Sequence, residues 1–105
     1  YPPAAHILLV LIISKVEERA EEASIHLGEA IKAMVEEQQL KVQMIGPATA
    51  SLAKANDYYR RVIYIKHEDY GTLVGIKNYL EGYLNYSKLF SDCSVQFDFD
   101  PMSSY

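Results

Sequence analysis

The centre of this chain, from Gly46 to Lys66, reads GPATASLAKANDYYRRVIYIK. It opens with a glycine–proline pair, which predicts a loop up to Asp57, and it closes with a β-branched run that predicts a strand over residues 61–66. Residues 41–66 contain five basic residues and one acidic residue, although the whole chain has a net charge of −4. An anionic partner would therefore have to meet the middle of the chain.

Three elements are predicted ahead of this centre. Residues 7–13 are apolar without interruption, which is typical of a strand covered on both faces. Ser14 and Glu17 have the spacing of a capping box and predict the start of a helix of about 22 residues with one apolar stripe. Residues 39–45 alternate between apolar and polar side chains and predict a short edge strand that ends at Gly46 and the following proline.

Two further elements complete a recognisable order. Asp69 is the expected N-cap of a second helix, and residues 95–99 alternate as a strand that Pro101 ends. The order strand, helix, strand, strand, helix, strand predicts an α+β fold, a ferredoxin-like βαββαβ sandwich with two helices on one face of a four-stranded antiparallel sheet. Right-handed crossovers place the first and third strands in the middle.

Both central strands lack polar alternation, so we expect both of their faces to be covered. Two helices on one side of the sheet explain only one of these faces. Either the rest of the domain covers the other face, or a neighbouring domain or a second copy of the chain does.

The length of 105 residues suits one domain with one core. A single cysteine, Cys93, excludes an internal disulfide and a zinc cluster of thiolates, and it fits a reducing, cytoplasmic setting. Residues 7–13 are far short of the roughly 20 that span a membrane. The opening Tyr-Pro-Pro lacks an initiator methionine, so we expect a piece of a longer chain, with residues 1–3 as linker and residues 102–105 as a loose tail.

The sequence shows no catalytic constellation. The three histidines have no spacing that a zinc site or a triad would need. Asp98 and Asp100 lack a third cation ligand nearby, so a turn at the strand end explains them better. Residues 46–48 lack the Gly-Lys-Ser/Thr ending of a phosphate loop, and the central strands lack the aromatic motif of RNA-recognition domains. We therefore expect no catalytic residue, metal site or cofactor here.

Positive charge and aromatic rings are interleaved in the central stretch. The basic residues are Lys54, Arg60, Arg61 and Lys66, and three tyrosines lie among them. This combination suits single-stranded DNA, because arginines meet phosphates and rings stack on bases. The same residues also suit a structural role, in which Tyr59 packs under the loop and the charges solvate the end of a strand.

Three motifs follow one another in order along the chain: Tyr-Pro-Pro at residues 1–3, a block over residues 46–60, and Asp-Phe-Asp-Pro at residues 98–101. Together they resemble the C-terminal domain family of primosomal protein N-prime, which has Tyr-Pro-Pro, a Gly-Pro-Ala-Pro-Ala block with Leu, Lys and Tyr-Arg, and a closing Asp-Val-Asp-Pro. Four residues depart from the family pattern, where proline or a basic residue is common: Thr49, Ser51, Asn56 and Tyr58. These departures weaken the expectation of direct DNA contact at the loop more than they weaken the resemblance to the family.

The resemblance implies that residues 1–105 are the single C-terminal domain of a bacterial, cytoplasmic, ATP-dependent three-prime to five-prime DNA helicase that restarts stalled replication forks. It implies a noncatalytic module for DNA binding and docking. The candidate DNA contacts are Lys54, Arg60, Arg61 and Lys66, and the candidate loop and docking residues are Gly46, Pro47 and Tyr59. ATP, magnesium and zinc would then serve the rest of the helicase.

The implied partners are branched or single-stranded DNA, the tail of single-stranded-DNA-binding protein, and the other domains of the helicase, with no membrane. The alternative is a purely structural interdomain or protein–protein module that never touches DNA. A third possibility, a small-molecule-sensing domain, needs a polar pocket between paired domains, and the sequence offers none.

Overall fold

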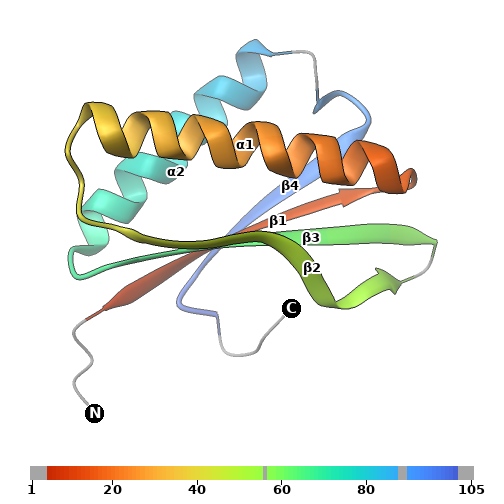
Figure 1. Ribbon diagram of the computed structural model, residues 1–105, viewed down its shortest axis with the longest axis horizontal. Coiled ribbons are helices and arrows are strands. Elements are labelled where there is room, and N and C mark those ends of the chain that lie inside the picture. The colour runs from red at the N-terminus through yellow and green to blue at the C-terminus, as the bar shows by residue number, and fades with distance from the viewer. Residues whose placement is uncertain (1–4, 56, 88–89, 102–105) are drawn as a thin grey trace.

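The computed structural model describes residues 5–55, 57–87 and 90–101, so the expected linker and tail lie outside the described residues (Figure 1). In chain order the elements are β1 (His6–Ser14), α1 (Glu17–Glu37), β2 (Gln43–Ala55), β3 (Tyr58–His67), α2 (Tyr70–Tyr86) and β4 (Cys93–Phe99). The strands form one sheet in the order β2-β3-β1-β4, with antiparallel neighbours. Both helices cover the same side of it (Figure 1). The predicted ferredoxin-like α+β sandwich is confirmed, with β1 and β3 in the middle.

The main core lies between the helices and the sheet. Alternate β1 residues face the helices, because successive side chains of a strand point to opposite sides. The fully buried members are Leu8, Val10 and Ile12 from β1, Leu27 and Ile31 from α1, Ile63 and Ile65 from β3, and Leu73, Ile76 and Leu80 from α2. The apolar stripe expected on the first helix therefore faces the core, and α2 contributes apolar residues to the same core. Asp69 caps α2 as predicted, since its Oδ2 accepts hydrogen bonds from the backbone N–H and the hydroxyl of Thr72.

A second apolar cluster lies on the side of the sheet away from the helices. Leu9, Leu11 and Val62 are only 1%, 5% and 3% exposed, and Ile13 and Tyr64 pack against them. The chain therefore buries the second face of its central strands without a neighbouring domain or a second copy. This outcome agrees with the first of the two alternatives that the sequence left open.

Strand β2 is longer than the sequence predicted. Gly46 and Pro47 do not end a strand, and most of the expected loop up to Asp57 continues as β2. The prediction was wrong because β2 lies at the edge of the sheet, where the missing N–H of a proline costs no pairing hydrogen bond. The pairing of β2 with β3 shifts register between Ile45 and Ala48, so Gly46 and Pro47 are accommodated within the strand.

The capping box predicted at the start of α1 is absent. Ser14 is a buried residue of β1, and its hydroxyl donates to the carbonyl of Asp92 and accepts from the N–H of Val16. Val16 is the N-cap and makes no side-chain cap hydrogen bond. Because the Ser14 hydroxyl joins β1 to the turn before β4, it does not cap the helix together with Glu17. The helix itself spans 21 residues, close to the predicted length.

Within the described ranges, neither helix combines the length and the apolar character that crossing a bilayer demands.

Candidate nucleic-acid interface

Strands β2 and β3 form a hairpin, and its closed end holds three of the four predicted basic contacts. Lys54 is the register partner of Tyr59, so its backbone lies across the hairpin from the residue before Arg60. The structure describes only the backbone at Lys54. Arg60 and Arg61 follow directly on β3. The antiparallel hairpin thus brings together residues that are separated along the sequence.

Arg60 and Arg61 lie on opposite faces of the sheet. Arg61 alternates with Ile63 and faces the helices, whereas Arg60 alternates with Val62 and lies on the open side. The Nη1 of Arg61 donates to Thr49 Oγ1 at 3.2 Å, and its buried Nε has no hydrogen-bond partner among the described residues. Arg61 is therefore half-buried and joins β3 to Thr49 of β2.

A small cavity of about 20 Å³ lies beside this guanidinium, at the start of α1. It is lined by Glu17, Ala20, Thr49, Tyr59, Arg60 and Arg61. The Glu17 carboxylate shares this lining, so the local charge next to Arg61 is mixed. Arg60 lines the same cavity, so this acidic residue is common to both arginines and does not distinguish them.

Lys66 does not join the other basic residues. It lies on the same face of β3 as Arg60, six residues further along. At about 3.3 Å per residue the two Cα atoms are roughly 20 Å apart. The predicted strip is thus a cluster at the hairpin end plus one separate lysine near the other end of β3.

A fifth basic residue, Lys15, belongs with the hairpin end and was missed from the sequence. Its Nζ lies 5.6 Å from the centroid of the Tyr58 ring, a cation–π contact, and Tyr58 is 40% exposed. The antiparallel pairing of Ser14 with Tyr59 brings Lys15 beside Tyr58. The register of the two central strands was the signal that could have revealed it. Lys15, Lys54, Arg60 and Arg61, together with Tyr58, are called the hairpin-end cluster below.

The three predicted docking residues lie within the fold's own packing. Gly46 has φ +98°, and a Cβ on it would meet the carbonyl oxygen of Val62 at 2.7 Å. Pro47 packs so closely on α1 that a Cβ on Gly28 would lie 3.1 Å from its Cγ. Tyr59 is half-buried and pairs with Ser14 of β1. These residues hold β2 against β3 and α1.

The closing Asp-Phe-Asp motif ties the end of β4 to the start of the neighbouring strand β1. Asp100 Oδ1 accepts the backbone N–H of Ile7 at 2.8 Å, and Oδ2 lies 2.9 Å from His6 Nδ1. The hydrogen bond from His6, followed by that from Ile7, lowers the pKa of Asp100 below its ordinary value of 3.8. A strand-end turn accounts for this carboxylate, as predicted. Among the described residues, no three histidine, cysteine or carboxylate side chains gather as metal ligands.

Solved structures share the fold over nearly the whole chain. A de novo designed protein, Foldit4, has a TM-score of 0.62 and 16% identity, covering 94% of this chain and 99% of that chain. A dimeric ferredoxin-like protein from an uncultured marine organism has a TM-score of 0.61 and 14% identity, covering 90% and 92%. A hydantoinase/carbamoylase family amidase from Burkholderia ambifaria has a TM-score of 0.57 and 12% identity, covering 96% of this chain but 28% of that one. Such identities establish the fold alone.

No curated protein sequence gives a significant match to this chain. The family model described as the primosomal protein N C-terminal domain, in contrast, matches residues 1–102. That span contains all three of the motifs noted in the sequence and every element of the sandwich. Because the match covers nearly the entire chain, this protein belongs to the primosomal protein N C-terminal domain family, which connects it with primosomal replication restart.

Proposed function

We propose that this chain is the noncatalytic DNA-binding and docking domain of a primosomal replication restart helicase. The carrying observation is the hairpin-end cluster, in which the backbone pairing brings Lys54 of β2, Arg60 and Arg61 of β3, and Lys15, just after β1, to one end of the sheet in a chain of net charge −4. Lysine and arginine bind the phosphate backbone without regard to sequence, as a protein working at any stalled fork requires. Tyr58, exposed at the same place, can stack on an unpaired base.

Two of the proposed contacts lie on the side of the sheet away from the helices. Arg60 and Lys66 lie on that face, roughly 20 Å apart along β3. Val62, which lies between them on the same face, is only 3% exposed, so the two residues are proposed as separate contacts, whereas Arg61 on the helix side donates to Thr49 Oγ1. Arg60 and Lys54 are therefore the proposed phosphate contacts at the hairpin end, and Lys66 is a separate one.

The remaining assignments belong to the same proposal. ATP hydrolysis with magnesium, and zinc binding, would be the work of other domains of the helicase. The proposed partners are branched or single-stranded DNA, those other domains and the tail of single-stranded-DNA-binding protein, in the cytoplasm of a bacterium.

The test compares two substitutions that remove one positive charge each. Arg60→Gln removes a proposed phosphate contact, and Lys32→Gln removes an exposed lysine of α1 as a matched control. Binding of labelled forked DNA is measured by fluorescence anisotropy over a series of salt concentrations. Arg60→Gln should lower the affinity and reduce the slope of log K against log salt by about one, and Lys32→Gln should change neither. Equal behaviour of the two variants would remove Arg60 from the interface.

A purely structural role is the second candidate, and one observation favours it. Gly46, Pro47 and Arg61 all make their contacts inside the fold. On this alternative the chain binds no forked or single-stranded DNA even at low salt, yet deleting it from the longer helicase lowers the unfolding temperature of the remaining domains. Measurable binding at low salt with a steep salt dependence would exclude it.

A further inference from the structure

The two edge strands of the sheet differ in how well they resist pairing with a further strand. Strand β2 contains Pro47 and two register shifts, and prolines and bulges are features that protect an edge. The other edge strand, β4, pairs with β1 from Cys93 to Phe99 without a register shift, and it contains neither proline nor lysine. Within the described chain β4 pairs with β1 alone, so its outer side can accept another strand.

The backbone groups on this outer side belong to alternate residues of β4. The N–H of Asp100, which continues the register of β4, donates to the carbonyl of Ile7 at 2.7 Å. Asp100 and every second residue before it therefore direct their backbone groups toward β1, because the direction alternates along an antiparallel strand. The residues between them, which include Val95 and Phe97, direct their N–H and C=O groups outward.

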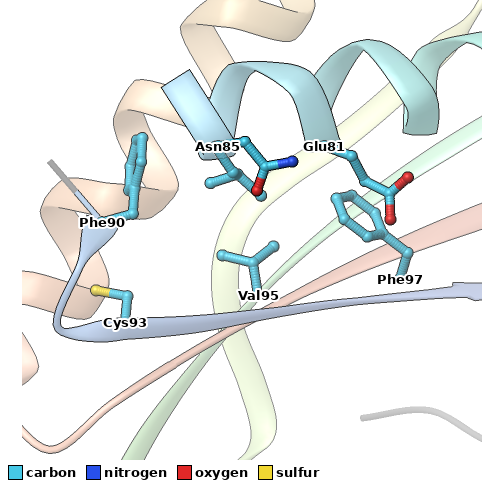
Figure 2. A pocket seen from close by; sticks show the side chains of 7 residues that line it. Glu81, Asn85, Phe90, Cys93, Val95 and Phe97 are labelled. Carbon is cyan, nitrogen blue, oxygen red and sulfur yellow. The ribbon is translucent and has the colours of Figure 1, made fainter. Parts of the chain in front are cut away.

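A groove of about 300 Å³ lies beside this edge on the helix side (Figure 2). It is lined from α2 by Glu81, Leu84 and Asn85, and from β4 by Cys93, Val95 and Phe97. Helix α2 packs mainly over β1 and β3, so it is set back from the edge and leaves room for an added strand. Val95 and Phe97 point toward α2 and are only half-buried (Figure 2). A strand added here would extend their apolar surface with every second side chain of its own.

Antiparallel pairing of β4 with a second copy of itself, centred on Gln96, matches the residues of this edge. On the helix side, Val95 of one copy then lies opposite Phe97 of the other, and pairs of an aromatic and a β-branched residue stabilise sheets. On the other side, Ser94 lies opposite Asp98, so the two Asp98 carboxylates do not oppose each other. Every outward backbone group is paired, with about eight hydrogen bonds, and a shift of register by two residues would lose some of them.

The local charges also permit this pairing. The acidic side chain that lines the groove, Glu81, has its Oε1 2.8 Å from Lys77 Nζ. A two-fold axis through Gln96 makes the contact identical for both copies and closes the assembly as a dimer. We propose that this chain forms a two-fold dimer by antiparallel pairing of β4 with β4, which joins the two sheets into one. The contact lies at the opposite edge of the sheet from β2, so it goes beyond the proposed DNA contact.

The first measurement is sedimentation equilibrium of the full chain over a wide range of concentration, up to that of an NMR sample. We expect a reversible monomer–dimer equilibrium, weaker than that of interfaces that bury about 800 Å² per partner, because the contact is one short strand. Amide NMR shifts on dilution should be concentrated in β4. Added salt should favour the dimer, since it screens the repulsion between two chains of net charge −4, whereas it weakens DNA binding.

Charge exchange at the two-fold axis locates the contact. Gln96→Lys places two like charges opposite each other and should weaken self-association about fivefold or more, and Gln96→Glu should do the same. A mixture of these two variants should associate more tightly than either variant alone. The matched control is Gln43→Lys, which changes another exposed glutamine on the other edge strand and should have little effect. Amide spectra confirm that each variant is folded.

A cysteine at the same position tests the register directly. Opposed residues of this kind have Cα atoms about 4.5 Å apart, within the range that a disulfide spans. In a Cys93→Ser background, Gln96→Cys should give a disulfide-linked dimer under mild oxidation. Gln43→Cys in the same background should stay monomeric.

Four outcomes would overturn the proposal: a chain that stays monomeric at the highest concentration, equal losses in Gln96→Lys and Gln43→Lys, a mixture of the two Gln96 variants that associates no better than either alone, or dilution shifts confined to β2. Arg60→Gln should leave self-association unchanged, which keeps this result independent of the proposed DNA contact.

Discussion

At the scale of single residues, Gly46 shows how one backbone position shapes the edge strand. Its φ of +98° is unfavourable for residues with a Cβ, and the space where that atom would lie is occupied by the carbonyl oxygen of Val62 on β3. The following residue, Pro47, then packs on Gly28 of α1. Glycine is required here by both conformation and close approach, whereas the sequence alone suggested only a strand end.

Gly46→Ala should therefore lower the free energy of unfolding by about 2–3 kcal/mol, since it combines backbone strain with a clash. The matched control is Gly82→Ala in α2, where a new Cβ has no atom within 4 Å. That change should raise stability by about 0.5–1 kcal/mol, because alanine is the better helix former. Urea denaturation gives both values. A Gly46→Ala variant as stable as the parent chain would mean that the strand relaxes freely at this position.

At the scale of elements, the start of α1 depends on β1 and β4 rather than on its own first turn. The Ser14 hydroxyl joins Val16 to the carbonyl of Asp92. The same turn receives Arg19, whose Nε lies 2.8 Å from Asp92 Oδ2 and lowers the pKa of that carboxyl through their hydrogen bond. These contacts connect the first turn of α1 with the turn that leads into β4.

Substitutions at the two ends of the rejected capping box should consequently differ. Ser14→Ala leaves the N–H of Val16 and the carbonyl of Asp92 without their partner and should cost about 1–2 kcal/mol of unfolding free energy. Glu17→Gln should cost less than about 0.5 kcal/mol, because Glu17 makes no capping hydrogen bond. The comparison is made by chemical denaturation at neutral pH. Similar losses of unfolding free energy in both variants would indicate that Ser14 and Glu17 do form a capping box.

At the scale of the whole molecule, the chain has two apolar clusters but only one helical layer. The cluster of Leu9, Leu11 and Val62 is buried on the side without helices. The domain therefore buries the apolar residues of its second sheet face with its own chain.

Leu11→Ala should lower the free energy of unfolding by about 2–4 kcal/mol, the loss typical of a buried leucine. Ile25→Ala removes a similar side chain from α1 at a site that is 46% exposed, and it should change stability by less than about 0.5 kcal/mol. Thermal and urea unfolding of both variants give the difference. If both variants lost an equally small amount of unfolding free energy, this cluster would behave as exposed surface and not as a core.

The sequence by itself determined the order of the elements, the central position of β1 and β3, and the N-cap at Asp69, because these depend on local periodicity and capping chemistry. From the sequence, four basic residues were also predicted as candidate DNA contacts. Tertiary structure decided which of them meet: pairing of β1 with β3 adds Lys15, side-chain alternation turns Arg61 away from Arg60, and strand length separates Lys66. The alternation of residues 39–45 predicted an edge strand, but only the assembled sheet shows that this strand continues through Pro47 to Ala55. Contacts between distant segments depend on register and burial, and local patterns do not contain either.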